Sequence, residues 1–267
     1  MNRTLSILSR LKRFEAFRFR LVHKASLSTS SPAVVLLSGG LDSTTCLAVA
    51  LRDGFDVYAL SFDYGQRHRH ELLCARRIAE YFRCREHRIA QIDLRVFGGS
   101  ALTSDAYAVP KDRLPSSAPD ASIPVTYVPA RNTIFLSYAL AYAEVIGSTD
   151  IFMGANVVDY SGYPDCRPEY FRIFEKLAMV GTRMGVVQGE KKRNIQVHTP
   201  LLYLSKAEII SLGTRLGVDF GMTHSCYDPV TPDGKPCGRC DACRIREEAF
   251  RKLGYGGDPA MQRFDSG

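Results

Sequence analysis

The sequence contains no apolar run that approaches the roughly 20 residues a membrane-spanning helix needs, so we expect no membrane partner. It also contains no internal repeat, and its excess of positive charge is confined to one end. Residues 1–31 hold seven basic side chains and a single acidic one, whereas the formal charge of the whole chain is +7. The rest of the chain is therefore close to neutral, which argues against nucleic acid as a partner.

The first 31 residues almost lack acidic side chains and are rich in arginine and serine. They also lack the uninterrupted apolar core of a secretory signal. This composition is typical of an organellar transit peptide, and it predicts a protein of the mitochondrial matrix. A disordered basic tail on a cytoplasmic protein is the alternative.

Short apolar segments alternate with helical patterns from residue 32 onward. Strands are expected at 33–37, 56–62, 86–92, 150–155 and 195–198, and helices at 43–52, 67–82, 132–146, 168–183 and 205–216. This alternation predicts an α/β fold with a doubly wound parallel sheet, in which ligands bind at the C-terminal ends of the strands. The proline-rich segment 93–129 interrupts the alternation, and it predicts either a substrate lid or a surface loop.

The loop of residues 38–44, Ser-Gly-Gly-Leu-Asp-Ser-Thr, follows the first expected strand and is called the phosphate loop below. It lacks the lysine of a Walker A motif and the G-x-G-x-x-G spacing of a dinucleotide site. Glycines between a strand and a helix N-terminus let the backbone N–H groups and the helix dipole meet an anion. We therefore predict that this loop binds a phosphate group. A turn that binds nothing is the alternative.

Four of the eight cysteines crowd together near the C-terminus with the spacing C-x10-C-x2-C-x2-C. They are Cys226, Cys237, Cys240 and Cys243, called the cysteine cluster below. Four thiolates complete a tetrahedral site, so we predict one structural Zn²⁺ per chain in a C-terminal region of residues 219–267. An iron–sulfur cluster is the main rival, although the ferredoxin pattern needs a further cysteine at position 247, which is glutamate.

The phosphate loop resembles that of the N-type ATP pyrophosphatases, the PP-loop superfamily, which transfer AMP to a substrate oxygen. Four further strings follow it in order. They are "FDYGQRHRHELLCA" from residue 62, "VPARNTIFLSYALAYAE" from 128, "GANVVDYSGYPDCRPEYF" from 154 and "HTPLLYLSKAEII" from 198. Together with the cysteine cluster, these strings closely resemble the QueC family of 7-cyano-7-deazaguanine synthases over residues 33–255.

The resemblance implies a PP-loop ATP-binding α/β domain over residues 32–218 and a homodimer. It implies a ligase that uses ATP and ammonia to convert 7-carboxy-7-deazaguanine to 7-cyano-7-deazaguanine in queuosine biosynthesis. ATP would be bound by Leu37, Ser38, Gly39, Gly40, Leu41, Asp42, Ser43, Thr44 and Thr45. Asp42 would act catalytically by helping to hold the Mg²⁺ that accompanies the triphosphate. A tRNA thiolase of the same superfamily and a nucleotide-binding homologue without catalysis are the alternatives.

The expected chemistry gives roles to a few other side chains. The planar guanidinium of Arg131 suits a carboxylate or a phosphate, and we expect it to act in both binding and catalysis. Asp165 is expected to accept the two adjacent N–H donors of a deazaguanine base, and Tyr163 to stack on its ring. Asp159 and Glu169 are rival carboxylates for that role. The sequence assigns no general base.

Overall fold

The computed structural model describes residues 30–112, 123–158, 163–187 and 194–264. Residues 1–29 of the predicted transit peptide and Asp159 therefore lie outside the described residues, as does the middle of the proline-rich segment. The strands are β1 (Pro32–Leu36), β2 (Asp56–Asp63), β3 (Glu86–Gln91), β4 (Asp150–Phe152) and β5 (Gln196–His198). The main helices are α2 (Leu41–Arg52), α3 (His70–Tyr81), α4 (Arg131–Ile146), α5 (Pro168–Gly181), α7 (Lys206–Arg215) and α8 (Asp241–Lys252). Shorter ones are α6 (Arg183–Val187), α9 (Pro259–Gln262), and the 3₁₀ turns η1 (Leu94–Val96), η2 (Pro164–Cys166) and η3 (Phe220–Met222).

The five strands form one parallel sheet in the order β3-β2-β1-β4-β5. In the central strand, Val34 lies opposite Tyr58 of β2 and Ile151 of β4. The strand order reverses beside β1, because β2 follows on one side and β4 on the other. In open α/β sheets such a reversal creates a crevice at the C-terminal ends of the strands. The phosphate loop begins at that point.

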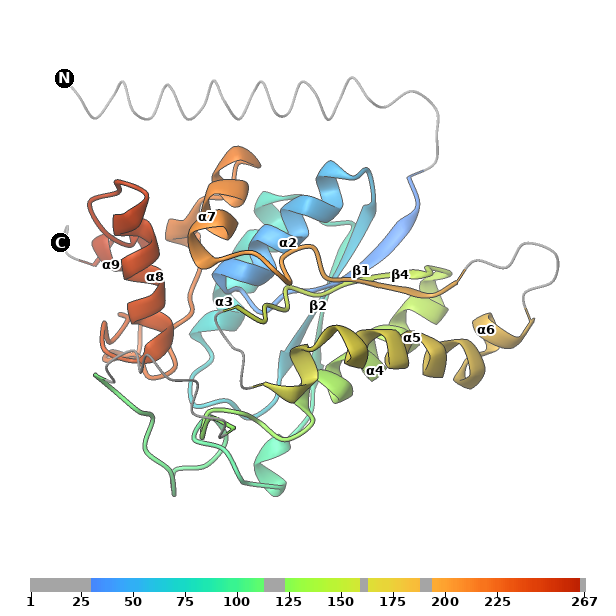
Figure 1. Ribbon diagram of the computed structural model, residues 1–267, viewed down its shortest axis with the longest axis horizontal. Helices are drawn as coiled ribbons and strands as arrows, with labels where there is room; N and C mark the ends of the chain where they lie inside the picture. Colours follow the sequence, from blue (N-terminus) through green and yellow to red (C-terminus); the bar gives the residue numbers. More distant parts are fainter. Residues whose placement is uncertain (1–29, 113–122, 159–162, 188–193, 265–267) are drawn as a thin grey trace.

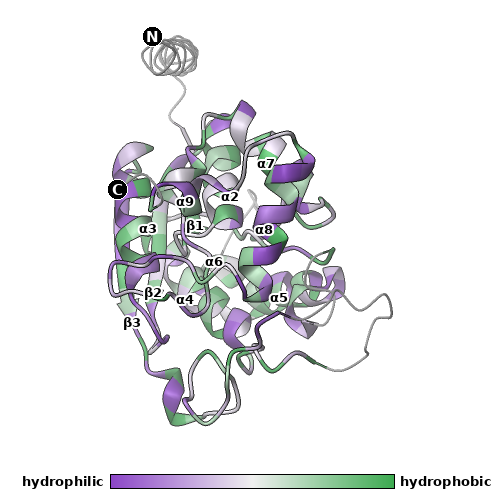
Figure 2. Cartoon of the chain, turned by 90° about the vertical axis from the view of Figure 1, so that its left-hand side faces the viewer, coloured by the Kyte–Doolittle hydropathy of each residue, from purple (hydrophilic) through white to green (hydrophobic). Residues whose placement is uncertain are grey.

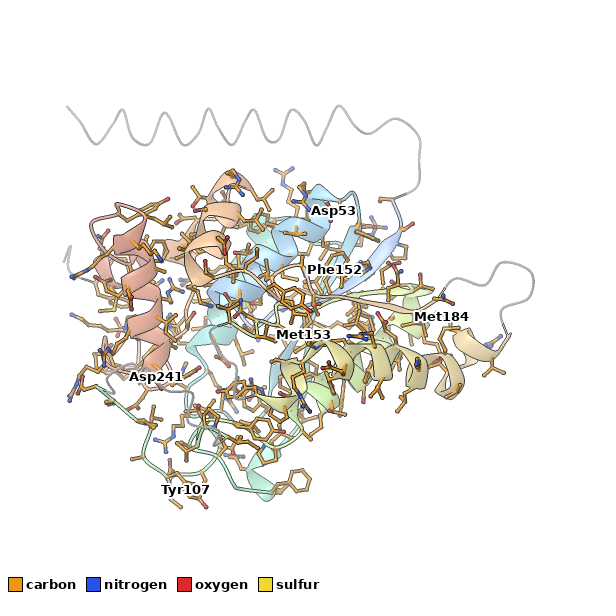
Figure 3. All side chains as sticks on the ribbon, in the orientation of Figure 1. Asp53, Tyr107, Phe152, Met153, Met184 and Asp241 are labelled. Carbon is orange, nitrogen blue, oxygen red and sulfur yellow. The ribbon has the colours of Figure 1, made fainter. Side chains whose placement is uncertain are left out.

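Helices cover both faces of the sheet, as Figure 1 shows. Alternate residues of β1 point to opposite faces: Val35 packs with α2, α3 and α7, whereas Val34 packs with α4 and α5. The consecutive residues Phe152 and Met153 at the end of β4 divide in the same way between the two cores (Figure 3). The predicted doubly wound parallel sheet is therefore confirmed.

The C-terminal helix α8 shares the core of the α2 face. Much of α8 is coloured hydrophilic in Figure 2, but Ala249 and Phe250 are buried among residues of α2 and α7. The helical appendage expected after the α/β domain is thus packed directly onto that domain. No helix among the described residues is long and apolar enough to span a membrane.

The expected helices and strands are found, and two of their boundaries differ by three residues for local reasons. The strand expected to reach residue 155 ends at Phe152. Gly154 then packs against the start of α2, where a Cβ would lie 3.0 Å from the carbonyl carbon of Asp42. The helix expected from residue 67 begins at His70. The side chain of Arg67 instead turns toward the proline-rich segment, where its Nε donates to the carbonyl of Ala101.

Candidate active site and metal centre

A cavity of about 260 Å³ opens at the C-terminal ends of β1, β2 and β4. The phosphate loop forms one wall, and the residues that begin α3 and α4 form another. The predicted site residues that line it are Leu37, Ser38, Gly40, Leu41, Asp42, Ser43, Arg131 and Tyr163. Gly39, Thr44, Thr45 and Asp165 are not part of the lining. The structure therefore brings together the phosphate loop and the predicted substrate residues around one space.

Gly39 lets the backbone of the phosphate loop adopt a conformation that other residues disfavour. Its φ angle is +85°, and a Cβ on it would lie 2.2 Å from the carbonyl oxygen of Glu71 in α3. Only glycine fits such a backbone. Gly40 is different, because an added Cβ would meet no atom closer than 3.3 Å. The positive φ angle and missing side chain of Gly39 therefore let the loop pack against α3. The space beside Gly40 instead faces the cavity.

Hydroxyl groups around the loop fall into two groups. The Oγ atoms of Ser38 and Ser43 are 2.9 Å apart, and both residues line the cavity, although the Ser43 hydroxyl also donates to the carbonyl of Gly40 at 3.2 Å. Thr44 and Thr45 are buried, and their hydroxyls donate to the carbonyls of Gly40 and Leu41 at 2.7 and 3.0 Å. The hydroxyls of these two threonines thus stabilise the first turn of α2, and neither residue lines the cavity.

Asp42 is held by a lysine that the sequence analysis did not identify. Lys206, the first residue of α7, places Nζ 2.8 Å from each carboxylate oxygen of Asp42. The lysine side chain is only 6% exposed. A cation at a helix N-terminus opposes the helix dipole, and that unfavourable position in "LSKAEII" was the available signal. The pair sets a positive and a negative group side by side at the start of α2.

Ser225 joins the phosphate loop to the C-terminal region. Its Oγ accepts hydrogen bonds from the backbone N–H of Leu41 at 3.4 Å and from Nη1 of Arg246 at 3.0 Å. Because both contacts use the oxygen as acceptor, the hydroxyl proton is directed elsewhere, and Ser225 lines the cavity. Arg246 is itself fixed by a buried ion pair with Asp258 at 2.7 Å. In addition, the N–H of His224 donates to the carbonyl of Gly39 at 2.9 Å.

Arg131 begins α4 and lies among aromatic and acidic groups. Its Cζ atom is 6.0 Å from the centre of the Tyr64 ring. Burial disfavours its charge, but Tyr64, Tyr163 and Asp165 raise the pKa of Arg131 above its usual range. Ala130 before it has a φ angle of +52°, a strained conformation of the kind that collects at functional sites. A permanent cation on this wall suits a carboxylate or phosphate ligand.

Asp165 lies directly behind the cavity wall, in η2. Its Oδ2 accepts a hydrogen bond from the backbone N–H of Asn132 at 3.2 Å, at the start of α4. Its Oδ1 is buried and has no hydrogen-bond partner among the residues that the structure describes. Burial raises the pKa of the Asp165 carboxyl. The neighbours Tyr163 and Cys166 reach the cavity itself, and burial raises the pKa of the Cys166 thiol to about 11, as expected for a packed cysteine.

The cysteine cluster is assembled as predicted. The four Sγ atoms lie within 4.8 Å of one another, and three of the cysteines are buried. Tetrahedral zinc with Zn–S bonds of about 2.3 Å would separate the sulfurs by about 3.8 Å, so the cluster fits this ion. The backbone N–H groups of Cys237 and Cys240 donate to the Sγ of Cys226 and Cys237 at 3.2 and 3.3 Å. Such donors stabilise thiolate ligands, which supports a metal over four free thiols.

The proline-rich segment connects the cavity with the cysteine cluster. Arg67, on the cavity wall, donates to the carbonyls of Ala101, Ser104 and Tyr107 in this segment. Figure 3 labels Tyr107 on this loop and Asp241 at the start of α8. Further along, Lys111 pairs with Cys240 in an antiparallel bridge. The described ends of the segment are thus packed beside the site, while its middle lies outside the described residues.

Comparison with known proteins places the chain in one family. Residues 32–254 match the model of the queuosine biosynthesis protein QueC. The 7-cyano-7-deazaguanine synthase of Paramagnetospirillum magneticum is 58% identical over 86% of this chain and 97% of that protein. The 7-cyano-7-deazaguanine synthase of Solidesulfovibrio magneticus is 57% identical over 89% of this chain and 99% of that protein. The chain therefore belongs to the QueC family, as its motifs predicted.

Proposed function

We propose that the chain is an ATP-dependent ligase that converts 7-carboxy-7-deazaguanine and ammonia to 7-cyano-7-deazaguanine. The observation that carries the proposal is one cavity that joins the phosphate loop to Arg131, in a chain 58% identical to a curated synthase of that name. A carboxylate is a poor electrophile because oxide is a poor leaving group. Transfer of AMP to the carboxylate supplies a leaving group, and the expelled pyrophosphate needs a site of the kind that the phosphate loop offers.

The triphosphate would lie along the start of α2. Donors for it are the hydroxyls of Ser38, Ser43 and Ser225 and the N–H groups at the helix N-terminus, which carries partial positive charge. Lys206 adds a cation at the same place. Mg²⁺ fits this donor set, because it is commonly bound by one or two carboxylates together with substrate phosphates, and Asp42 is the carboxylate that the loop provides. When bound, the ion would neutralise phosphate charge.

Arg131 would hold the substrate carboxylate, and the reaction then follows in two stages. AMP transfer to the carboxylate and attack by ammonia give an amide, with loss of AMP. AMP transfer from a second ATP to the amide oxygen, followed by elimination of AMP, gives the nitrile. In both stages Arg131 orients the accepting oxygen toward the α-phosphorus of ATP, and this positioning is its contribution to the rate.

A single assay tests the function. The full chain is incubated with 7-carboxy-7-deazaguanine, ATP and ammonium, and the products are identified by mass spectrometry. The proposal predicts the nitrile, two AMP and two pyrophosphate per turnover, and an amide that appears first. If no nitrile forms, the same chain is incubated with tRNA, ATP and a sulfide donor, and thiolated tRNA would support a thiolase instead. ATP binding without product in either incubation would support a non-catalytic homologue.

For base recognition we keep Asp165, because its buried Oδ1 is an acceptor that lacks a partner among the described residues. In Asp165→Asn one acceptor becomes a donor that faces the donors of the base. A hydrogen bond to a charged group contributes about 1.5–3 kcal/mol, so kcat/KM for the deazaguanine is expected to fall roughly ten- to a few hundred-fold. The KM for ATP should stay constant. The two substrates are titrated separately on the purified variant.

Glu169→Gln is the matched control, since Glu169 is an exposed carboxylate at the start of α5. It should behave as the unmodified chain does. An equal loss for both substrates in Asp165→Asn would show that Asp165 only holds the start of α4 through Asn132. No loss in that variant would move the role to Glu169 or Asp159.

We propose that the chain forms a homodimer through α5. Ile173, Leu177 and Val180 lie on one side of this helix and are 65%, 55% and 78% exposed. An apolar stripe of this kind commonly marks an interface between copies. Ile173→Asp is expected to convert the dimer to a monomer in sedimentation velocity. Val96→Asp, at an equally exposed valine on η1, should leave the mass unchanged. A wild-type chain that sediments as a monomer would contradict the proposal.

For the leader we retain the mitochondrial proposal, which depends on composition alone. Residues 1–31 precede the segment that matches the family model. Fusion of these residues to a fluorescent protein tests import directly. Fluorescence in the cytoplasm would refute it.

A further inference from the structure

We infer that Glu71 is the general base that removes a proton from ammonium in the amide-forming step. This inference rests on the proposed function and names a residue for a role that the sequence left unassigned. Glu71 is in the first turn of α3 and lines the same cavity as Arg131 and the phosphate loop.

Glu71 is held rigidly in this position. Its Oε1 accepts a hydrogen bond from Nε2 of Gln66 at 2.9 Å. Gln66 is in turn fixed to the backbone, because its Oε1 accepts from the N–H of Tyr64 at 2.8 Å. The carbonyl of Glu71 packs against Gly39. The backbone of Glu71 is therefore packed against the phosphate loop, and its carboxylate is held through Gln66 at the end of β2, in a position from which it can meet an ammonium ion in the cavity.

The groups that face Glu71 leave it ready to exchange a proton near neutral pH. Burial in the cavity wall raises the pKa of Glu71 to about 7. Arg131 from α4 and the hydrogen bond from Gln66 oppose this rise, while Asp63 at the end of β2 adds to it. A carboxylate with such a pKa binds a proton and releases it again at the working pH of most enzymes.

Other ionisable groups of the described cavity wall are less suited to this task. Both oxygens of Asp42 are engaged by Lys206. Both ring nitrogens of His224 are buried. The Nε2 of His68 is 2.7 Å from the carbonyl oxygen of Cys226. Glu71 remains as the carboxylate that is both accessible from the cavity and free of a cationic partner at hydrogen-bond distance.

The proton balance is simple. Ammonium is attracted to the Glu71 carboxylate, and one N–H bond breaks as its proton passes to a carboxylate oxygen of Glu71. The freed lone pair of ammonia attacks the adenylated carbon, the C–O bond to AMP breaks, and AMP leaves with that electron pair. The new C–N bond carries one surplus proton, which is lost to water. Glu71 then returns its own proton to solvent before the next turnover.

The Glu71→Gln variant separates amide formation from the adenylation that precedes it. Adenylation alone is measured as carboxylate-dependent exchange of labelled pyrophosphate into ATP without ammonium, and it should be unchanged. Amide formation at pH 7 should fall about 10²–10⁴-fold, the range for loss of a general base. Glu80→Gln, an exposed glutamate on the same helix, is the control and should match the unmodified chain in both assays.

The pH profile identifies a base rather than a structural carboxylate. As pH rises through about 7, Glu71 becomes ionised, so kcat/KM for ammonium in the unmodified chain should rise and then level off. In Glu71→Gln only free ammonia reacts, so the rate should keep rising with pH and show no break. Glu71→Asp keeps a carboxylate, so its pH profile should again level off, with a lower kcat/KM for ammonium than in the unmodified chain.

The outcomes distinguish the two proposals. If the unmodified chain shows no carboxylate-dependent exchange, the proposed function fails and the role of Glu71 fails with it. If exchange is normal but Glu71→Gln forms amide at the unmodified rate, the function stands and Glu71 is not the base. Equal loss of exchange and amide formation in Glu71→Gln would make it a structural residue, which also overturns the inference.

Discussion

Gly40→Ala is expected to abolish turnover and leave the protein folded. A Cβ on Gly40 would lie 3.3 Å from the Oγ of Ser38 and 3.5 Å from that of Ser225, distances that the ligand-free protein tolerates. The methyl group would nevertheless stand between the two hydroxyls proposed to bind phosphate. Loss of one preorganised donor typically costs about 10²–10³-fold in rate, and the methyl displaces more than one. We therefore expect kcat/KM for ATP to fall at least about 10²-fold.

The neighbouring glycine provides the contrast. Gly39→Ala combines a φ angle of +85° with a Cβ placed 2.2 Å from the carbonyl of Glu71, so α3 must move away from the loop. The strained φ alone costs roughly 1–2 kcal/mol, and with the clash the loss should reach about 4 kcal/mol or more. Urea denaturation measures both variants. Near-normal turnover of Gly40→Ala would refute the close approach of phosphate to the backbone.

Cys240→Ser is expected to remove the metal and much of the stability. Cys240 is fully buried in the cysteine cluster, and structural zinc contributes folding free energy directly. The zinc content measured by elemental analysis should fall from one ion per chain to none. A loss of several kcal/mol should lower Tm by roughly 10 °C or more in a chain of this size. Cys84→Ser, a half-buried cysteine outside the cluster, is the control and should keep both values.

Cys240→Ser should weaken ATP binding more than it slows the chemical step. The cluster residue Cys226 follows Ser225 and His224, which hydrogen-bond to the phosphate loop. Loss of the metal therefore loosens two loop contacts, and the KM for ATP should rise more than kcat falls. Iron with acid-labile sulfide in the purified protein would overturn the zinc assignment, and a normal KM for ATP in Cys240→Ser would refute the coupling.

Local patterns predicted the parts of this structure that depend on neighbours in sequence. The alternation of Val34 and Val35 between the two faces follows from the strand period, and the spacing of the cysteines is sufficient to recognise a tetrahedral site. The phosphate loop was recognisable because strand, glycines and helix start are contiguous. These features need no knowledge of how distant segments meet.

Residues brought in by tertiary packing were not predictable in this way. Lys206 lies 164 residues from Asp42, and Ser225 lies 184 residues from Leu41. Nothing in either local sequence states which partner it will meet. Thr44 is among the residues expected to bind ATP, but its hydroxyl is used by the turn of α2. The role of a polar side chain thus depends on which competing acceptor lies within reach, and only the fold decides that.

The contact between Ser225 and Leu41 has a consequence for the order of events during synthesis. β1, the phosphate loop and α2 leave the ribosome early, and N-terminal segments generally begin to fold first. Yet the N–H of Leu41 obtains its acceptor from a residue made 184 positions later, and Arg246 and Asp258, which fix that acceptor, are made later still. We therefore expect a nascent chain to bind nucleotide only after nearly its whole length has emerged, which ribosome-bound chains of increasing length would test.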